Sequence, residues 1–560
     1  MPIIRLLETK RPCRLLTVLC LLLWLPGFFT IPPTDRDEAR FAQATKQMLE
    51  SGDFVRIRNG DEERNRKPVG IYWLQAPFAA AARAAGIAAE NPIWPYRVPS
   101  LLGGLLGVYA TFGLGQRLVG RRAALLGAAM LAGSAALVVE SHIAKTDAVL
   151  LAATTATMGL LGRAYLDPGG FARRHAAGFW IALAVGILVK GPITPMVAGL
   201  AAGSLAFADR RERGSAWLLA LRPGWGVPLM LAIVLPWFVA IGVATHGAFF
   251  AQSVGGDLGR KLASDDESHA GPPGLHLLLL PLTLFPAAIA VLACLPAAWR
   301  ARSEPAVRFL IAWVLPSWLV FEAAPTKLPH YPLPLFPPLC LFAARWALEA
   351  RRFGPPAWLR RVAIGACGLA AALFGLGAAA LPVVIGPRRA GVDLLGVPAL
   401  AGATLLGWLI WRALRDWPRA ILSGLLAMPL LTWSVLGLEL PRLGSLWIAP
   451  QLAAALRAHW RDGQPPDAGF ATLGFAEPSV RFRCGTDTGL FGDATRGAEF
   501  LAAAPNRVLA VEQRDLPAFA QASARIGIVP HGFATVAGFN YSHGRRVALT
   551  LFESAPNTLR

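Results

Sequence analysis

The sequence predicts a polytopic α-helical membrane protein that carries a small polar domain at its C-terminus. Of its 560 residues, 55% are hydrophobic and only 16% are charged, and the mean hydropathy of +0.48 is high for a soluble protein. Apolar runs of about 20 residues, each long enough to cross roughly 30 Å of hydrocarbon as a helix, recur along most of the chain. These observations exclude a disordered, collagenous or ordinary cytosolic protein, and the length of the runs excludes an outer-membrane barrel.

Hydropathy places thirteen predicted spans in the first 440 residues. The first span follows basic residues and precedes no small-residue cleavage site, so we expect a retained membrane helix and not a signal peptide. Two shorter spans meet near Lys190 and form either two helices or one broken helix pair. The predicted spans cover residues 12–31, 98–117, 122–140, 146–164, 175–189, 192–208, 226–245, 274–297, 307–323, 331–348, 360–385, 394–412 and 418–438.

The net charge of +20 is distributed as a membrane topology requires. With a cytoplasmic N-terminus, the predicted inner segments hold 25 Lys and Arg residues, whereas the short outer loops hold seven. We therefore predict that the N-terminus is cytoplasmic and that the C-terminal domain is periplasmic. Basic residues near anionic lipid headgroups account for the pI of about 10.7 without a nucleic acid partner.

The six cysteines are scattered along the chain, and no two of them form a C-x-x-C pair. Five of them lie in or beside apolar segments, where a thiol behaves as a small hydrophobic group. The sequence therefore predicts neither a zinc site nor a disulfide framework.

Two segments are too polar to span the membrane, and both are expected on the outer side. The first outer loop, 32–97, belongs to a membrane domain of residues 1–440 and is expected to carry interfacial helices. The tail, 445–560, alternates strand-like and helix-like stretches, which is typical of a small α/β or α+β domain. The strand-like stretches are 470–474, 480–483, 507–511 and 545–552, and the helix-like stretches are 450–459 and 516–525.

Lysine usage is the clearest indication of chemistry. The inner segments are basic almost wholly through arginine, whereas six of the seven lysines fall on the outer side. A lysine at a helix end is a compact charge suited to phosphate, or it is a snorkelling side chain that reaches the headgroups. The outer lysines are Lys46, Lys67, Lys145, Lys190, Lys261 and Lys327.

The first outer loop begins with a cluster of carboxylates. Thr34 and Asp37 fit a capping box at the start of an amphipathic helix that runs to Leu49 and stops at Ser51-Gly52. A structural cap would account for Asp37. However, carboxylates this close to the headgroups are repelled unless they have a partner or a role, so we favour a function for Asp37.

A basic segment, R-N-R-K-P at 64–68, precedes an apolar and aromatic segment at 69–78. This pattern predicts a second interfacial helix with Tyr72 and Trp73 at the membrane boundary. A cation at the start of that helix can hold an anionic headgroup.

Two further acidic features lie in outer connections. Asp147, between the third and fourth spans, either caps the fourth span or belongs to a site. Asp265, Asp266, Glu267 and His269 are interpreted as a solvated loop, because their spacing does not support metal ligation.

Several short motifs occur in a fixed order along the membrane region. The motifs are D-E-A-R-F-A at 37–42, M-L-E-S-G-D-F at 48–54, K-P and Y-W within 67–73, T-D at 146–147, K-G-P at 190–192 and K-L-P-H-Y-P-L-P-L-F-P-P at 327–338. In this series the chain resembles the GT-C type, polyprenyl-phosphate-dependent membrane glycosyltransferases (glycosyltransferase family 39). These include the lipid A aminoarabinose transferase and the protein O-mannosyltransferases. The predicted spans and outer C-terminal domain also resemble the aminoarabinose transferase architecture.

The resemblance implies roles for individual residues. Asp37, Glu38 and Lys67 are the implied catalytic residues: Asp37 lies at the reacting centre, Glu38 supports it, and Lys67 holds the donor phosphate. The implied substrate-binding residues are Arg40, Tyr72, Asp147, Lys190, Lys327 and Tyr331.

Arg66 departs from the family pattern, since some members have an acidic residue there that binds a metal with a loop histidine. We therefore expect no metal and no other cofactor. The implied reaction transfers a sugar from polyprenyl (undecaprenyl) phosphate to a lipid A-like, glycolipid or protein acceptor, with inversion, on the periplasmic face of a bacterial inner membrane. The alternative is a polytopic transporter, but the ionisable residues gather at the outer boundary and no internal repeat is evident.

Overall fold

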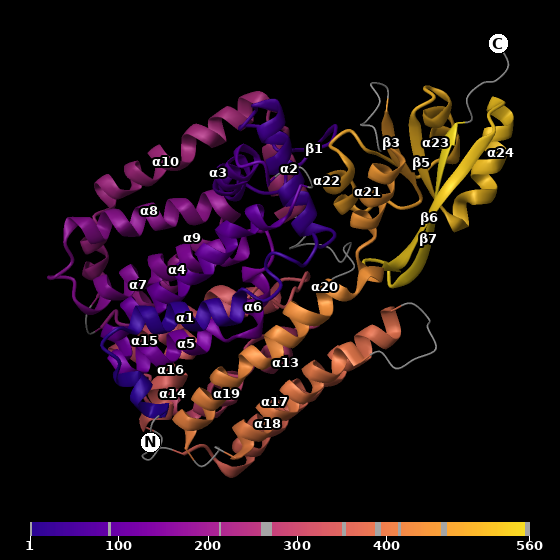
Figure 1. Ribbon diagram of the computed structural model, residues 1–560. Coiled ribbons are helices and arrows are strands. Elements are labelled where there is room, and N and C mark those ends of the chain that lie inside the picture. Colours follow the sequence, from indigo (N-terminus) through magenta and orange to yellow (C-terminus); the bar gives the residue numbers. More distant parts are fainter. Residues whose placement is uncertain are drawn as a thin grey trace.

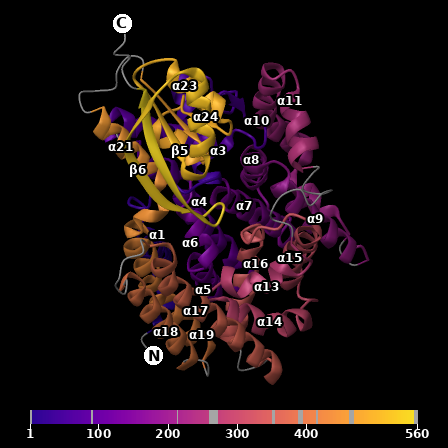
Figure 2. The same ribbon diagram turned by 90° about the vertical axis from the view of Figure 1, so that its right-hand side faces the viewer.

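The chain folds into a helical part followed by a smaller α/β part (Figure 1). Figure 2 shows that the α/β part stands on one end of the helical part and leaves the other end free. The computed structural model describes residues 3–87, 91–211, 214–258, 271–349, 354–386, 394–412, 416–460 and 468–554.

The helical part is built from antiparallel helices joined by short turns. Its helices are α1 (Pro12–Trp24), α2 (Asp37–Ser51), α3 (Gly70–Ala84), α4 (Trp94–Val119), α5 (Arg121–Ala132), α6 (Ala135–Ser141), α7 (Asp147–Leu166), α8 (Arg173–Lys190), α9 (Ile193–Ala208), α10 (Pro223–Ala244), α11 (Ala248–Phe250), α13 (Leu275–Thr283), α14 (Ala288–Arg300), α15 (Pro305–Ala323), α16 (Phe336–Glu349), α17 (Ala357–Ile385), α18 (Val397–Arg412), α19 (Trp417–Thr432) and α20 (Leu440–Arg442).

Seven helical segments of the described residues are long and apolar enough to cross a membrane, or eight if the bent pair α5 and α6 counts as one span. That pair bends by 61°. Each predicted span coincides with a helix or with a pair of helices interrupted by a short break. Several of these helices are too short to cross alone, so the count of thirteen stays a prediction. The seven segments are Trp94–Val119, Asp147–Leu166, Pro223–Ala244, Pro305–Ala323, Ala357–Ile385, Leu394–Arg412 and Trp417–Arg442.

The chain reverses sharply between α8 and α9. Gly191 has a φ of +65°, a left-handed conformation that glycine adopts without steric cost, and Pro192 then precedes α9. The two predicted short spans are therefore separate helices, and Lys190 stands at the end of α8.

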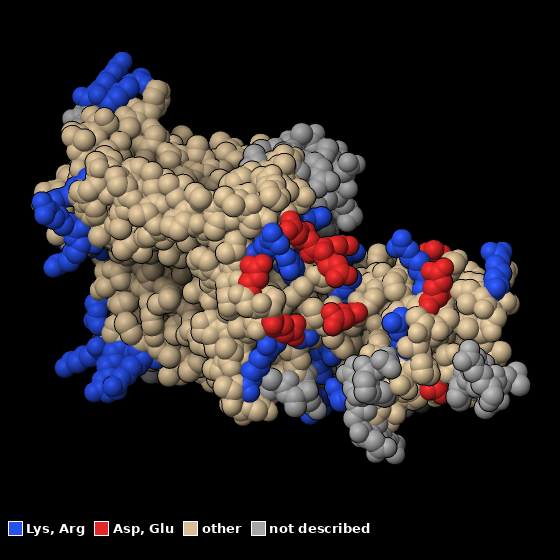
Figure 3. All heavy atoms as spheres, turned by 90° about the horizontal axis from the view of Figure 1, so that it is seen from above, with Lys and Arg blue, Asp and Glu red and all other residues tan. Residues whose placement is uncertain are grey.

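The surface of the helical part is divided by charge (Figure 3). Lys and Arg side chains gather at the end far from the α/β part, a wide uncharged belt follows, and acidic and basic side chains mix near the α/β part. An apolar belt of this kind matches the hydrocarbon core of a bilayer. The mixed-charge end is the one at which α4 and α7 begin and α8 ends.

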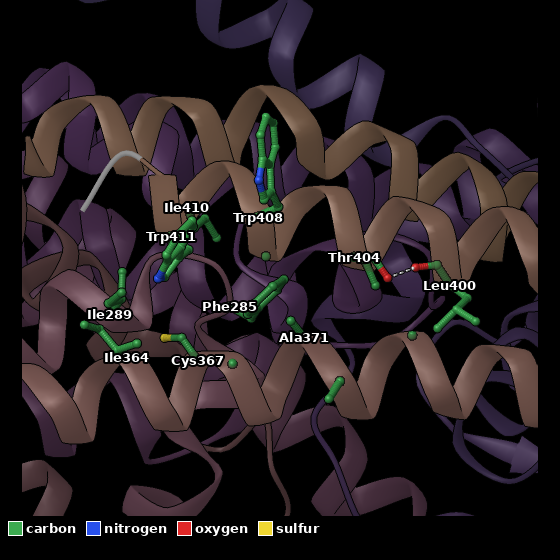
Figure 4. A pocket seen from close by; sticks show the side chains of 15 residues that line it. Phe285, Ile289, Ile364, Cys367, Ala371, Leu400, Thr404, Trp408, Ile410 and Trp411 are labelled. Carbon is green, nitrogen blue, oxygen red and sulfur yellow. Dashed lines mark hydrogen bonds between the residues drawn. The ribbon is translucent and has the colours of Figure 1, made fainter. Parts of the chain in front are cut away.

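An apolar hollow of about 330 Å³ lies within the belt between α17 and α18, against Phe285 and Ile289 (Figure 4). Trp408 and Trp411 of α18 and Cys367 of α17 line it, and none of its fifteen lining residues is charged. This uncharged lining suits hydrocarbon and not a sugar phosphate, so we place the candidate site elsewhere.

Helix α2 ends as the sequence predicts but begins differently. Gly52, with a φ of +72°, terminates the helix after Ser51. At the other end, the N–H and hydroxyl groups of Thr34 donate to Glu38 at 2.8 and 2.9 Å, whereas Arg36 occupies the N-cap position without a side-chain cap bond. The alternative role of Asp37 as a helix cap is therefore wrong: Glu38 reaches back instead, which leaves Asp37 available for the favoured functional role.

The α/β part contains a five-stranded mixed sheet in the order β4-β3-β5-β7-β6. Strands β3, β4 and β5 are parallel, whereas β7 pairs antiparallel with β5 and β6. Helices α21 and α22 contact one face through Phe470 and Val508, and α23 and α24 contact the other through Leu473 and Leu509. The elements are α21 (Ile448–His459), β3 (Gly469–Leu473), α22 (Pro478–Cys484), β4 (Gly489–Phe491), α23 (Ala494–Ala502), β5 (Arg507–Glu512), α24 (Leu516–Ile526), β6 (Pro530–Asn540) and β7 (Arg545–Ser554).

One predicted strand of this part is wrong. Residues 480–483 lie within helix α22, which has Pro478 in its first turn, where the missing N–H costs nothing. The alternating pattern of V-R-F-R misled the prediction, because Phe482 of this helix is buried against Tyr96, with ring centroids 5.3 Å apart. The other three predicted strands and both predicted helices are confirmed within a few residues, and β4 and β6 were not predicted.

The α/β part docks on the segment that leads into α2. The backbone N–H of Ser479 donates to Asp35 Oδ1 at 3.1 Å, and the Arg36 guanidinium donates to the carbonyl of Ser542 at 2.8 Å. The Asp35 N–H donates to the hydroxyl of Tyr541, in the β6–β7 turn. The two parts therefore meet at the residues directly before Asp37.

Burial raises the pKa of Asp35 to about 7, and the nearby Glu477 adds to the rise. Because the folded-state pKa exceeds that of the unfolded chain, protonated Asp35 favours the docked fold at low pH, and this contribution is lost as the pH rises through about 7. We predict that the thermal midpoint of the wild type falls by roughly 2–4 °C between pH 5.5 and 8.5, and that Asp35→Asn abolishes this fall. Scanning calorimetry in detergent measures it.

The matched control is Glu499→Gln, at an exposed carboxylate of α23, which should keep the wild-type pH dependence. Parallel curves for the wild type and Asp35→Asn would contradict the role assigned to Asp35.

Candidate functional site

The candidate site lies at the mixed-charge end of the helical part, under the first loop. Helix α2 supplies carboxylates from above, and the ends of α6, α7 and α8 supply charged groups from below. The loop at 325–332 closes one side. Segments far apart in sequence therefore meet where the belt ends and the α/β part begins.

A buried ion pair fixes the start of α2. Arg97 of α4 donates to Glu38 through Nε at 2.7 Å and through Nη2 at 2.9 Å, and both side chains are at most 1% exposed. Glu38 also accepts from the N–H of Ala144 at 2.9 Å. Although burial alone would raise the pKa of Glu38, Arg97 and the backbone donors hold it below its ordinary value. Glu38 is thus an anchor for α2, not a group open to a substrate.

Asp37, the next carboxylate back along the chain, is about half exposed and faces cations. Its Oδ1 lies 3.9 Å from Nη2 of Arg64. Partial desolvation works to raise the pKa of Asp37, but the charges of Arg64, Lys145 and Arg40 outweigh it and hold the pKa below its ordinary value. Asp37 is therefore ionised at neutral pH.

Two polar atoms beside Asp37 have no hydrogen-bond partner among the described residues. One is Nη1 of Arg64, whose guanidinium lies 4.6 Å from the ring centroid of Phe41. The other is the hydroxyl of Tyr72, a fully buried residue of α3 whose burial raises its pKa to about 12. Buried donors are normally satisfied, so these two atoms are candidates to bind an oxygen of a ligand.

A second cluster of charges surrounds Asp147, at the start of α7. Lys190 Nζ donates to its Oδ1 at 2.5 Å, and Lys145 Nζ lies 3.6 Å from its Oδ2. Lys145 also pairs with Glu140 of α6 at 3.0 Å, and His330 lies within 3.6 to 3.8 Å of both carboxylates. Asp147 thus binds cations, and its side chain forms no cap for α7.

The pKa values of Lys145 and His330, two loop residues of this cluster, are shifted in opposite directions. Burial disfavours charge on Lys145, but Glu140 and Asp147 outweigh it and raise the pKa of its ammonium. Burial lowers the pKa of His330 to about 3 despite the attraction of Asp147, so its imidazole is neutral at physiological pH. Tyr331, the next residue, lies under Lys190, whose Nζ is 5.4 Å from its ring centroid.

The two groups of charges form one site. Lys145 acts electrostatically on Asp37 as well as on Asp147, and Asp147 acts on Asp37. Of the residues expected from the sequence, the structure brings together Asp37, Arg40, Tyr72, Asp147, Lys190 and Tyr331 around Lys145 and Arg64.

The two other lysines expected at the site, Lys67 and Lys327, lie in loops. Lys67 is half-buried in the turn before Pro68, which leads into α3. Lys327 donates to the carbonyls of Gly271 at 2.8 Å and Ala324 at 2.6 Å, so it braces its own loop. The structure brings Lys327 to the site only indirectly, through the loop that also carries His330.

Sequence reasoning assigned no role to Glu140, Arg64, Arg97 or His330, and it noted Lys145 without assigning it to the site. The sequence could have identified Glu140 as a site residue, because it is a carboxylate inside a predicted span, where ionisable groups are costly and often functional. His330 lies within the K-L-P-H-Y series. Arg97 begins a span and gives no signal that distinguishes it from a snorkelling arginine.

No group of three or more His, Cys, Asp or Glu side chains is arranged to hold a metal ion in the part of the chain that is described. Asp265, Asp266, Glu267, His269 and Lys261 lie outside the described residues.

Comparison with known proteins shows what this chain is similar to. Residues 66–239 match the family described as dolichyl-phosphate-mannose-protein mannosyltransferase. The undecaprenyl phosphate-alpha-4-amino-4-deoxy-L-arabinose arabinosyl transferase of Pseudomonas paraeruginosa is 28% identical over 421 residues, covering 73% of this chain and 71% of the relative. The same enzyme of Pectobacterium atrosepticum is 26% identical and covers 61% of each chain.

The fold also resembles that of solved structures. The crystal structure of ArnT from Cupriavidus metallidurans bound to undecaprenyl phosphate superimposes with a TM-score of 0.72 at 20% identity, covering 96% of this chain and 97% of that one. Its apo state gives a TM-score of 0.70 at 21% identity. These comparisons support a GT-C membrane glycosyltransferase of the lipid A aminoarabinose transferase type, to which this chain is similar in sequence and in fold.

Proposed function

We propose that this glycosyltransferase moves a sugar from undecaprenyl phosphate, or a similar polyprenyl phosphate, to a lipid A-like acceptor. The names of the relatives and the undecaprenyl phosphate in the similar crystal structure support this pair of substrates. A glycolipid or protein hydroxyl is the second candidate acceptor, because the matching family is described as acting on proteins. The transporter alternative has no such support.

The observation that carries the proposal is an ionised carboxylate set among cations with spare donors. Asp37 is held negative by Arg64, Lys145 and Arg40, while Nη1 of Arg64 and the hydroxyl of Tyr72 lack partners among the described residues. A sugar phosphate requires both signs of charge, because positive charge develops on the sugar while negative charge develops on the departing phosphate.

In the proposed reaction, an acceptor oxygen attacks the anomeric carbon from the side opposite the phosphate, so the anomeric centre inverts. The bond between that carbon and the phosphate oxygen breaks, and polyprenyl phosphate leaves with one more negative charge. Arg64 and Lys145 stabilise that charge, and the family resemblance gives the same role to Lys67, three residues after Arg64. Asp37 steadies the cationic sugar and accepts the proton where the acceptor is a hydroxyl; its low pKa favours the electrostatic role.

Other residues position these groups. Glu38 and Arg97 hold the start of α2, so we assign Glu38 a positioning role in place of the catalytic role expected from the sequence. Asp147 and Glu140 hold Lys145 and Lys190 in place through ion pairs. Lys327 braces the loop of His330 and Tyr331. We also propose that the reaction needs no metal ion.

A first prediction about the reaction concerns the bond between the sugar and the phosphate, with Asp37 on the sugar side and Lys67 on the phosphate side. Asp37→Asn should lower kcat by about 10² or more, because it removes a charge needed in the transition state, while donor binding stays near the wild-type value. Lys67→Ala should lower kcat/KM by about 10- to 100-fold through the lost phosphate contact. Release of labelled sugar from a polyprenyl-phosphate donor to lipid A measures both, and repetition in excess EDTA tests the metal proposal.

Glu62→Gln and Arg58→Ala are the matched controls, because they change charges of the same loop away from the cluster. Both should remain within about twofold of the wild type. If Asp37→Asn and Lys67→Ala behave like these controls, the loop is not the catalytic site.

A second prediction follows from the charge of Arg64. Removing it in Arg64→Gln should raise the pKa of Asp37, so the acid limb of the profile of kcat/KM against pH should move to higher pH. Arg40, Lys145 and Asp147 remain, so the shift should be partial. Arg58→Gln should leave the limb in place, and an unchanged limb in Arg64→Gln would show that Asp37 does not set it.

Membrane orientation gives a third prediction. We propose that the mixed-charge end and the α/β part are periplasmic, because the arginine-rich end matches the cytoplasmic side. An alkaline phosphatase fusion after Ser554 should be active, and a fusion in the turn after Glu304, between α14 and α15, should be inactive. The reverse pattern would place the site on the cytoplasmic side.

A further inference from the structure

A hollow at the end of the helical part opposite the candidate site has the features of a lipid-headgroup site. It has a volume of about 570 Å³ and lies between the last turns of α4 and α7. Its lining residues are Gly113, Leu114, Gln116, Arg117, Leu118, Gly159, Gly162, Arg163, Leu166 and Asp167. Figure 3 shows that basic side chains gather at this end of the molecule.

The protein neutralises the cations of this hollow only in part, since Asp167 acts electrostatically on Arg163 but forms no ion pair with it within the described residues. Within the described residues, neither Arg117 nor Arg163 makes an ion pair or a side-chain hydrogen bond, although Arg345 and Arg308, at the same end, both pair with carboxylates. The Nε atom of Arg163 is buried without a partner. A buried N–H donor normally has a hydrogen-bond acceptor, so the unsatisfied Nε–H of Arg163 points to an oxygen of a ligand.

The net charge of the hollow favours an anion. Asp167 is the one carboxylate among its lining residues, and it already accepts from the N–H of Gly170 at 2.9 Å. Arg174 also acts electrostatically on Arg163. Three arginines against one aspartate leave an excess of two positive charges.

The other wall of the hollow is apolar and lies deeper in the belt. Gly113 is exposed there, and a Cβ atom at this position would meet no atom within 4 Å. Leu114 and Gly159 continue this wall, one helical turn or less from the arginines. A cationic mouth above an apolar floor matches an amphiphile whose phosphate lies at headgroup level, and a free anion would leave the apolar floor uncovered.

We propose that this hollow binds an anionic phospholipid of the adjacent leaflet, with its phosphate on Arg117 and Arg163 and an acyl chain over Gly113. The site is separate from the sugar-transfer site, since it lies across the membrane belt from Asp37. Lipid binding at this hollow does not depend on which sugar is transferred.

The test is native mass spectrometry of the purified full chain, titrated with phosphatidylglycerol or phosphatidylcholine. We expect the first phosphatidylglycerol to bind the wild type about tenfold more tightly than phosphatidylcholine, and the variant with Arg117→Gln and Arg163→Gln to lose that preference. The matched control is Arg300→Gln, an exposed arginine at the end of α14 that does not line the hollow. It should bind like the wild type.

A second variant fills the hollow without removing charge. Gly113→Leu places a side chain where no atom is near, so it should keep the wild-type thermal midpoint while weakening phosphatidylglycerol binding about tenfold.

Three results would overturn the proposal. They are unchanged phosphatidylglycerol binding in both variants, equal binding of phosphatidylcholine by the wild type, and displacement of the lipid by millimolar inorganic phosphate. The last would show a site for a free anion and not for a lipid.

Discussion

The buried ion pair between Glu38 and Arg97 is the interaction on which the candidate site depends. Both side chains are withdrawn from water, so removal of either would leave an unpaired buried charge at a typical cost of about 3–5 kcal/mol. A pair of hydrophobic residues of similar volume would stabilise the fold as well, so the value of the ion pair is positional. It joins the start of α2 to α4 and, through Ala144, to the loop of Lys145, which places Asp37 opposite that lysine.

The α/β part holds the same segment from the other side. Asp35 and Arg36 bond to the turn at Tyr541 and Ser542, directly before Asp37, and Arg481 donates to the carbonyl of Asn59 at 2.8 Å. Arg36 has a φ of +66°, which non-glycine residues rarely adopt, so the docked turn compensates for local backbone strain. We infer that the α/β part positions the first loop, and that loosening this contact would disorder Asp37 before it affects the membrane helices.

The helices and the polar loops could be predicted from the sequence because hydropathy and charge asymmetry act along the chain. Asp37, Asp147 and Lys190 were found because each lies at a predicted boundary, where a charge needs a reason. Their partners were not found for a geometric reason. Arg97, Glu140 and Arg64 acquire meaning only when α4, α6 and the turn before α3 pack together, and linear spacing does not record those contacts. Likewise α22 alternates as a strand does, because Val480 is buried against the sheet whereas Phe482 is buried against the helical part.

The charge balance of the site explains why it can hold a phosphate although it carries only one excess positive charge when empty. Its cations are Arg40, Arg64, Lys145 and Lys190, and its carboxylates are Asp37, Glu140 and Asp147. Counted with all three carboxylates ionised and His330 neutral, four minus three leaves one positive charge. Such balance limits the cost of burial in a low dielectric. The donor phosphodiester carries one negative charge, which this single positive charge balances. In the proposed reaction the further negative charge develops beside Arg64 and Lys145, which are already in place, and such fixed charges favour the transition state.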